Sequence, residues 1–249
     1  MVRNIAAYRF VAVEDPSALA DALRERCKAH GLRGTAIVAP EGINLFLAGT
    51  PRDVDALLDW LRADPRFAGL QAKASESDVV PFARLKVKVK PEIITFDPAL
   101  RPHDTRAPSV DPATFARWLA SGNDDGGRPL VVLDTRNREE VAHGTFASAV
   151  TLPIDNFTEL PAAVAAHADA WRDATVVSVC TGGIRCEKSV LWMRESGFEH
   201  ALQLDGGILG YFQAVGGQGY AGACFVFDDR VALDPALRPI DTAAHSTPR

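Results

Sequence analysis

The sequence predicts two domains, an N-terminal α+β domain with the element order β-α-β-β-α-β and a C-terminal α/β domain around a mostly parallel sheet. The chain of 249 residues is long enough for one large domain or two modest ones. In the first 76 residues, the spacing of apolar residues alternates between the period of a strand and that of a helix. From Asp111 onward, short continuous apolar runs alternate with helical segments, which is typical of parallel strands covered on both faces.

The composition is that of an ordinary globular protein. Hydrophobic residues make up 47% of the chain and charged residues 24%, which excludes a disordered, collagen-like or coiled-coil chain. No stretch approaches the roughly 20 uninterrupted apolar residues of a membrane helix, and the N-terminus lacks the apolar run of a signal peptide. The four cysteines are too few for a disulfide scaffold, and neither they nor the histidines show the spacing of metal ligands. We therefore predict a cytoplasmic protein with no metal and no membrane partner.

Capping and turn residues divide the N-terminal domain, residues 1–96, into its elements. Asp15-Pro16-Ser17 and Thr50-Pro51 indicate helix starts, because a side-chain oxygen can cap the first turn and proline fits its first position. The elements expected, in order, are a strand over 4–13, a helix from 15 to 30, strands over 34–38 and 43–48, a helix from 50, and a strand over 70–75. This order is that of the ferredoxin-like, or acylphosphatase-like, split β-α-β fold, which hosts many unrelated functions.

A segment over 97–111 is rich in proline, aspartate and arginine and lacks apolar periodicity, which indicates a linker. The second domain is expected over residues 112–215. Its elements are predicted, in order, as a helix over 112–120, a strand over 130–133, a helical turn over 138–143, a strand over 150–152, a helix over 161–171, a strand over 175–179, a helix over 187–196 and a strand over 201–204. Residues 216–249 are a C-terminal segment, and its polar tail after Pro239 is expected to be disordered.

The candidate active site is the segment that begins with Cys180. This cysteine ends a predicted strand, and Gly182-Gly183 and Arg185 separate it from a helix expected to begin near Glu187. Sites in open α/β sheets form at the carboxyl ends of strands. The glycines let backbone N–H groups turn inward around an anion, while the helix N-terminus and Arg185 add positive charge. Because positive surroundings lower the pKa of a cysteine, we predict a thiolate nucleophile at Cys180; the alternative is an inert buried cysteine.

This segment resembles the active loop of a rhodanese domain, in which a cysteine carries a persulfide. Residues 133–136 with Glu140, and residues 204–208, are similar to motifs near the start and end of such domains. Cysteine phosphatases of this fold place an arginine six residues after the nucleophile, whereas Arg185 is five residues after Cys180, which favours a sulfur-sized group. Asp134 and Arg136 are expected to be a structural pair that braces the loop. The residues that the resemblance assigns to the support of Cys180 are Thr181, Gly182, Gly183, Ile184, Arg185 and Cys186.

Four segments together are similar to the rhodanese-type tRNA uridine-34 hydroxylase family. They are residues 84–90, 134–137, 180–188 and 224–230, and the resemblance extends over about residues 1–238. It implies a tRNA-modifying enzyme that converts uridine 34 of the anticodon to 5-hydroxyuridine, with Cys180 as the catalytic residue and molecular oxygen as co-substrate. The sequence carries no flavin, haem or non-haem iron signature, so no cofactor is evident.

Four basic residues alternate with apolar ones in a short segment of the N-terminal domain: Arg84, Lys86, Lys88 and Lys90. At strand spacing they share one face. Residues 1–90 hold 14 basic and 11 acidic residues, against 13 and 21 in residues 91–249, which points to a polyanion as the partner of the N-terminal half. By itself the pattern favours an exposed edge strand protected from aggregation by lysines. The family resemblance favours instead contact with tRNA through these four residues.

Two other functions stay open on the residues alone. A sulfurtransferase would use Cys180 to move a persulfide sulfur, and its chemistry is not distinguished from that of a hydroxylase by the sequence. A non-catalytic rhodanese-like binding module is disfavoured, because such modules usually lack the nucleophile. Cys186 is expected to be a packed loop residue, or else to resolve an oxidised Cys180 as a disulfide. No obligate protein partner is evident.

Further expectations concern residues outside these motifs. Glu187 and Lys188 are expected to be ordinary surface residues at the start of their helix. Three aromatic residues near the C-terminus, Tyr220, Phe225 and Phe227, are expected to pack in the core rather than to stack on bases. Cys27 is expected in the core.

Overall fold

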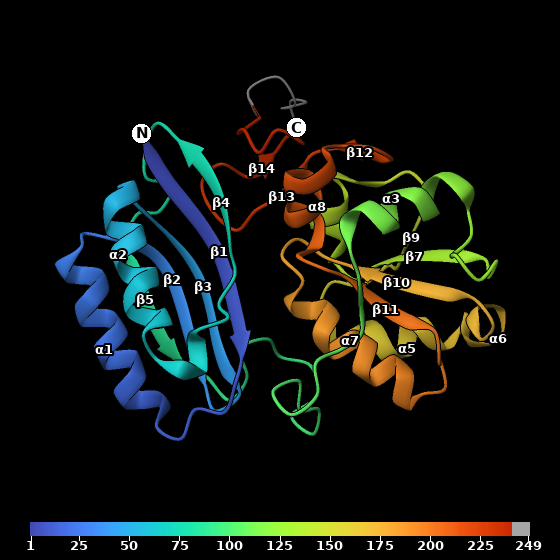
Figure 1. Ribbon diagram of the computed structural model, residues 1–249, viewed down its shortest axis with the longest axis horizontal. Helices are drawn as coiled ribbons and strands as arrows, with labels where there is room; N and C mark the ends of the chain where they lie inside the picture. The colour runs from blue at the N-terminus through green and yellow to red at the C-terminus, as the bar shows by residue number, and fades with distance from the viewer. Residues whose placement is uncertain (241–249) are drawn as a thin grey trace.

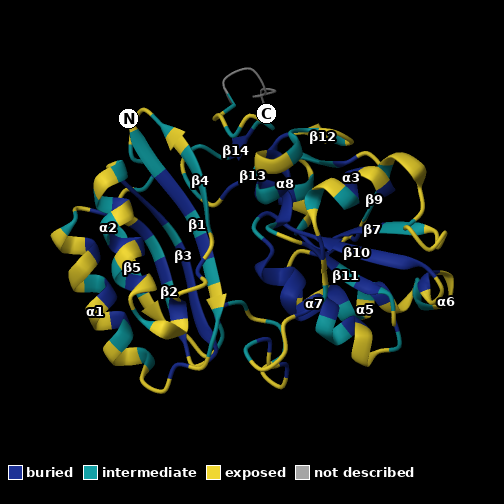
Figure 2. Cartoon of the chain, viewed as in Figure 1, coloured by how far each residue is buried: buried dark blue, intermediate teal, exposed yellow. Residues whose placement is uncertain are grey.

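The computed structural model describes residues 1–240, which form two domains side by side (Figure 1). The N-terminal domain is a mixed five-stranded sheet with two helices, and the second domain is a parallel five-stranded sheet with helices on both faces. Buried residues follow the two sheets and the sides of the helices that pack on them (Figure 2). Apart from Ile240, the tail after Pro239 lies outside the described residues.

The N-terminal sheet adds a fifth, parallel strand to four antiparallel ones. Its strands are β1 (Val2–Phe10), β2 (Arg33–Ala39), β3 (Gly42–Gly49), β4 (Ala72–Ser77) and β5 (Leu85–Val89), in the order β4-β1-β3-β2-β5. β1 is antiparallel to β3 and β4, while β2 is antiparallel to β3 and parallel to β5. The predicted split β-α-β topology is confirmed, and the basic segment forms β5 at the edge of the sheet.

Two helices, α1 (Pro16–Ala29) and α2 (Pro51–Arg62), build a core with one face of this sheet. Asp15 and Thr50 cap them as predicted, each accepting a backbone hydrogen bond from the first turn of its helix. Cys27 is fully buried in this core, which confirms the expectation for that residue. A 3-10 turn, η1 (Pro65–Phe67), leads from α2 towards β4. The opposite face of the sheet carries no helix and faces the second domain.

The second domain is built on a sheet of parallel strands. The strands are β6 (Ser109–Val110), β7 (Leu130–Asp134), β9 (Ala149–Thr151), β10 (Thr175–Val179) and β11 (Ala201–Leu204), in the order β6-β11-β10-β7-β9. Val177 and Val179 of the central strand pack with α3 (Pro112–Ser121) and α8 (Gly207–Val215), whereas Val176 packs on the other face. That other face is covered by α5 (Leu160–Ala165), α6 (Ala168–Trp171) and α7 (Ile184–Glu195). The predicted α/β class is confirmed.

Several elements differ from the sequence prediction, and α8 has no counterpart in it. The helix after Cys180 begins at Ile184 rather than near Glu187, because Gly183 adopts a φ of 98° and starts the helix at once. The helix expected over 161–171 is divided into α5 and α6. The N–H of His167 donates to the carbonyl of Val164, three residues back, and this tight turn ends α5. β6 forms within the segment expected as a linker, because its backbone pairs with the exposed edge of β11.

The C-terminal segment extends from the second domain to the first. β12 (Tyr220–Gly222) pairs with β8 (Gly144–Phe146), which follows the short helix α4 (Arg138–Val141). Beyond it, β13 (Cys224–Phe225) pairs with β14 (Ala232–Leu233). Earlier in the chain, within the second domain, the 3-10 turn η2 (Phe157–Glu159) precedes α5.

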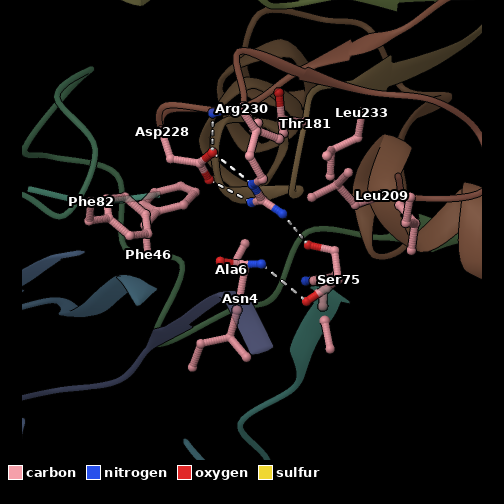
Figure 3. A pocket seen from close by; sticks show the side chains of 15 residues that line it. Asn4, Ala6, Phe46, Ser75, Phe82, Thr181, Leu209, Asp228, Arg230 and Leu233 are labelled. Carbon is pink, nitrogen blue, oxygen red and sulfur yellow. Dashed lines mark hydrogen bonds and ion pairs between the residues drawn. The ribbon is translucent and has the colours of Figure 1, made fainter. Parts of the chain in front are cut away.

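An arginine in this segment joins the two domains (Figure 3). The Arg230 guanidinium pairs with Asp228 at 2.5 Å and donates a hydrogen bond to the Ser75 hydroxyl of β4 at 2.7 Å. The N–H of Asp229 donates to the carbonyl of Pro81 at 3.1 Å. The segment between β13 and β14 is therefore anchored on the N-terminal sheet, beside the turn that carries Thr181.

Candidate active site

Cys180 lies at the carboxyl end of β10, the central strand of the second sheet, in the turn that leads to α7. The residue is 1% exposed, and the N–H of Gly183 donates a hydrogen bond to its Sγ at 3.2 Å. The positive φ of Gly183 turns this N–H inward, which is a conformation that suits glycine. A Cβ on Gly207 would lie 2.6 Å from both the Cys180 oxygen and the Gly183 nitrogen. The two glycine motifs therefore meet around Cys180.

Hydrogen-bond donors and positive charge favour the ionised form of Cys180. Burial by itself would raise the pKa of this thiol, but a hydrogen bond from the Cys186 thiol, the charge of Arg185 and two backbone N–H groups lower it to about 5. The pKa of Cys186 lies well above its usual range, because that thiol is buried and faces the Cys180 thiolate. Cys180 is therefore a thiolate at neutral pH, and Cys186 is a neutral hydrogen-bond donor beside it.

Arg185 is held in place by Glu140 of α4. The two terminal guanidinium nitrogens of Arg185 donate to the two Glu140 carboxylate oxygens, each at 2.6 Å, and both side chains are buried. Such a paired geometry restricts the guanidinium in position and in plane. The direct brace on the Cys180 turn is thus Glu140, a residue of the rhodanese-like motif to which sequence reasoning assigned no role.

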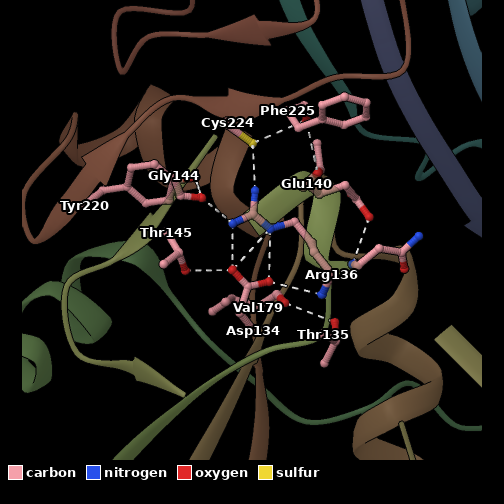
Figure 4. A network of polar contacts seen from close by, with 12 residues as sticks. Asp134, Thr135, Arg136, Glu140, Gly144, Thr145, Val179, Tyr220, Cys224 and Phe225 are labelled. Atoms are coloured by element: carbon pink, nitrogen blue, oxygen red, sulfur yellow. Dashed lines mark hydrogen bonds and ion pairs between the residues drawn. The ribbon is translucent and has the colours of Figure 1, made fainter. Parts of the chain in front are cut away.

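Asp134 and Arg136 form an ion pair with fully buried side chains (Figure 4). The Thr145 hydroxyl donates to Asp134 at 2.7 Å, and Arg136 donates to a β8 carbonyl at 2.7 Å and lies 4.0 Å from the Cys224 sulfur. These contacts join the end of β7 to β8 and to the C-terminal segment. Because Asp134 pairs with Val179 in the sheet, the pair supports the strand end that carries Cys180, and no described contact joins it to residues 181–186.

A pocket of about 190 Å³ opens in front of Cys180, between the two domains. One wall is the uncovered face of the N-terminal sheet, and the opposite wall is the Cys180 turn. Ile93 and Ile94, which follow β5, and Phe227 of the C-terminal segment complete the lining. The sheet contributes Ala6, Ala7, Tyr8, Ile37, Asn44 and Phe46. Cys180 therefore faces a chamber that neither domain builds alone.

Tyr8 of β1 reaches the Cys180 turn from the N-terminal domain. A Cβ on Gly183 would lie only 2.9 Å from the Tyr8 hydroxyl, and that hydroxyl is 3.4 Å from a Glu187 carboxylate oxygen. The Lys73 ammonium lies 4.9 Å from the centre of the Tyr8 ring. Burial raises the pKa of Tyr8 well above its usual value, so the side chain is neutral. Nothing in its local pattern separates Tyr8 from an ordinary strand residue, which is why sequence reasoning missed it.

Glu187 and Lys188 are buried, so the prediction that they are surface residues is wrong. The Lys188 ammonium lies 2.6 Å from Glu92 and 2.9 Å from Glu41, both on the N-terminal side of the interface. The Ala107 N–H donates to Glu187 at 3.2 Å. These residues are enclosed because α7 starts early and its first turn packs against the other domain.

The basic row of β5 has the geometry that the alternation predicts. Its members Arg84, Lys86, Lys88 and Lys90 are exposed, while Leu85 and Val87 pack against the N-terminal core. Lys88 pairs with Ile37 in the parallel register of β5 with β2, and paired residues point to the same face of a sheet. Because Ile37 lines the pocket in front of Cys180, the basic row lies on the sheet face that forms the pocket wall.

Within residues 1–240, no helix combines the length and the apolar character needed to cross a bilayer. The same residues contain no group of three or more His, Cys, Asp or Glu side chains arranged to hold a metal ion. All four cysteines are free thiols.

The fold and the site define a two-domain protein of rhodanese type, with an acylphosphatase-like N-terminal domain. Residues 2–93 match the family model of the UPF0176 acylphosphatase like domain, and residues 112–214 match that of the rhodanese-like domain. The chain is 60% identical over 242 residues to the tRNA uridine(34) hydroxylase of Xanthomonas euvesicatoria, covering 96% of this chain and 97% of the relative. It is 59% identical to that of Bordetella petrii, covering 98% and 97%. The chain belongs to the tRNA uridine(34) hydroxylase family.

Two solved structures are similar to part of this chain. A rhodanese-like domain from Anabaena has 22% identity and a TM-score of 0.37, and covers 46% of this chain and 79% of its own. A human single-domain sulfurtransferase has 26% identity and a TM-score of 0.36, and covers 43% of this chain and 97% of its own.

Proposed function

We propose that this protein hydroxylates uridine 34 of tRNA to 5-hydroxyuridine in the cytoplasm, with Cys180 as the catalytic residue and molecular oxygen as co-substrate. Membership of the family supports the reaction and the substrate. The structural observation that carries the assignment of Cys180 is its position: a thiolate with a lowered pKa lies at one wall of a pocket between two domains. The pKa values of the other three thiols are raised by burial, so Cys180 is the cysteine suited to react.

The N-terminal domain is proposed to bind the tRNA through Arg84, Lys86, Lys88 and Lys90. Alternate residues of a strand repeat every 6.6 to 6.8 Å or so, which is comparable to phosphate spacing along one strand of nucleic acid. The row lies on the sheet face that forms the pocket wall, so a strand of RNA bound along β5 could present a neighbouring base to Cys180. Single-stranded loops such as the anticodon loop are the parts of RNA whose bases can be splayed out in this way.

The overall chemistry replaces the hydrogen on carbon 5 of uracil by a hydroxyl group. With molecular oxygen as oxidant, one oxygen atom enters the base and the other leaves as water, so two electrons and two protons must come from a reductant. Arg185 and the N–H groups of the turn stabilise negative charge on sulfur. We assign them the role of keeping Cys180 ionised until it reacts.

Mass spectrometry of tRNA nucleosides tests this proposal. Cells that lack the gene would be complemented with the wild type, with Cys180→Ala, or with Cys27→Ala, a matched control in the N-terminal core. We expect 5-hydroxyuridine with the wild type and the control and none with Cys180→Ala. Growth under ¹⁸O₂ should place the label in the new hydroxyl group. Full hydroxylation by Cys180→Ala would remove Cys180 from the mechanism, and label from water would remove molecular oxygen.

A sulfurtransferase is the second candidate, and the turn around Cys180 supports it. The Gly183 N–H points at the cysteine sulfur, and the same donors would hold the anionic terminal sulfur of a persulfide. In that case the protein purified from cells would carry an additional sulfur on Cys180, and loss of the gene would remove a thiolated product while leaving 5-hydroxyuridine unchanged. The two functions therefore give opposite results in the same nucleoside analysis.

A further inference from the structure

We propose that the pocket in front of Cys180 holds one uracil base, flipped out of the RNA, and that Asn44 and Phe227 recognise it. Asn44 accepts a hydrogen bond from the N3–H of the base, and Phe227 stacks on the ring. This inference rests on the proposed function, and it identifies the residues that select the substrate base. Enzymes that act on a base take it out of its stack, read its Watson–Crick edge and hold it against aromatic or apolar side chains.

The size and lining of the pocket suit a pyrimidine ring. Its volume is about 190 Å³, while a protein cavity of about 150 Å³ is known to bind benzene. Uracil is also a six-membered ring and carries two further oxygens. Ile37, Phe46 and Ile93 make the lining mostly apolar, and Asn44 is the amide among the lining side chains. The base would therefore meet mostly apolar surface at its faces, with Asn44 at one edge and the polar side chains of the Cys180 turn at the other.

Asn44 offers an unpaired acceptor in this apolar setting. The residue is 7% exposed, and its Nδ2 donates to the carbonyl of Ile93 at 3.3 Å. Because a carbonyl can only accept, this bond sets the orientation of the amide and directs Oδ1 away from Ile93. Among residues 1–240, no hydrogen-bond donor reaches that oxygen, and the oxygen is not completely buried. An acceptor suits the N3–H of uracil and repels the N3 lone pair of cytosine.

Phe227 offers a stacking surface at the rim of the same pocket. Half of the residue is exposed, at 50%, so the prediction that it packs in the core is wrong. Its ring is held edge-on by Phe46 at 5.9 Å and by Phe225 at 5.2 Å between centroids, whereas Tyr220 packs against the core of the second domain, as predicted. A fixed and exposed aromatic ring is the platform on which single-stranded bases stack.

The placement of these groups also orients the base for reaction. Asn44 belongs to the sheet wall and Cys180 to the opposite wall. In uracil, N3 and C6 lie at opposite corners of the ring, so a base bound to Asn44 through N3 directs its C5–C6 edge towards Cys180. Lys88 lies on the same sheet face, beside Ile37 of the pocket wall, and can bind a phosphate of the flipped nucleotide or its neighbour.

Protection of Cys180 against alkylation tests the pocket without requiring catalysis. The probes are three anticodon stem-loop RNAs that carry uridine, cytidine or an abasic site at position 34. The rate at which iodoacetamide labels Cys180 would be followed by mass spectrometry as each RNA is added. We expect the uridine RNA to protect Cys180 at concentrations about tenfold or more below those of the other two, because the others lose the hydrogen bond or the stack.

Protein variants extend this test. Asn44→Leu should weaken protection by the uridine RNA about tenfold and abolish its advantage over the cytidine RNA. Phe227→Ala should weaken protection by both pyrimidine RNAs about tenfold or more and leave the abasic RNA unchanged. Asn123→Leu and Val79→Ala are matched controls, because both residues are exposed and lie outside the pocket. They should behave as the wild type.

The outcomes separate this inference from the proposed function. If all three RNAs bind but protect Cys180 equally, or if none protects it, the base pocket is refuted even when cells make 5-hydroxyuridine. If the uridine RNA protects selectively and cells make no 5-hydroxyuridine, the base pocket stands and the proposed hydroxylase fails. If Asn44→Leu does not fold, the comparison of the three RNAs on the wild type still tests whether the pocket selects uracil.

Discussion

Replacing Cys186 by alanine should raise the pKa of Cys180, because Cys186 donates a hydrogen bond to the Cys180 thiolate. A hydrogen bond to a charged group contributes about 1.5 to 3 kcal/mol, and one pKa unit corresponds to about 1.4 kcal/mol. Loss of the donor removes stabilisation from the ionised form, so the pKa should move from about 5 in the wild type to about 6 or 7 in the variant. At pH 6 the thiolate fraction would then fall from about 90% to between about 50% and 10%.

The assay is the rate of Cys180 alkylation by iodoacetamide between pH 4 and 9, followed by mass spectrometry of the peptide that contains it. Only the thiolate reacts, so the midpoint of the rate profile reports the pKa. Cys186→Ser is the matched variant, because a hydroxyl can donate the same hydrogen bond. Its midpoint should stay within about half a unit of the wild type, and it should keep measurable hydroxylation.

Three results would contradict this account. An unchanged midpoint in Cys186→Ala would mean that Cys186 does not stabilise the thiolate. A midpoint for the wild type near the ordinary cysteine value of about 8.5 would show that the turn does not activate Cys180 at all. A loss of activity in Cys186→Ser as complete as that in Cys180→Ala would favour a mechanism in which both thiols react.

Three further predictions concern RNA binding and stability. Lys86→Gln combined with Lys88→Gln should weaken tRNA binding at low salt. In a plot of log affinity against log salt concentration, the slope should become shallower by about 1.5 to 2. Equal affinity and parallel lines for variant and wild type would show that β5 is only a protected edge. Lys188→Met should lower the free energy of unfolding in urea by about 3 to 5 kcal/mol, because it leaves Glu41 and Glu92, which are largely enclosed, without their counter-ion. Lys28→Met, at an exposed pair, should change that free energy by less than about 1 kcal/mol. Similar effects of the two variants would refute the role of the Lys188 cluster. Between pH 5 and 8.5 the Cys180 thiol carries a proton in the unfolded protein and none in the folded protein. The contribution of this thiol to the free energy of unfolding should therefore grow as pH rises and be lost as pH falls through about 5. Wild type and Cys180→Ala should diverge in melting temperature as pH is raised, and parallel curves would contradict the lowered pKa.

The sequence alone was sufficient for the features that depend on neighbours along the chain. The apolar run over 175–179 predicts a buried parallel strand because such strands are covered on both faces, and the strand has those bounds. The glycines and Arg185 lie within five residues after Cys180 in the sequence. The positive charge and the backbone N–H groups around the thiol therefore come from the same short segment. The alternation of lysines predicts one basic face of β5, because side chains of a strand alternate by geometry.

Only the tertiary structure decided how the site is enclosed. Lys188 belongs on a surface by composition, yet it is buried because Glu41 and Glu92, remote in the chain, lie against it. Asn44 and Phe227 are separated by most of the chain and share one pocket with Cys180. Which residues meet across a domain interface depends on how two folded surfaces fit together, and local periodicity carries no information about that fit. The lowered pKa of Cys180 is therefore a property of one short segment, whereas the pocket around this thiol is a property of the whole fold.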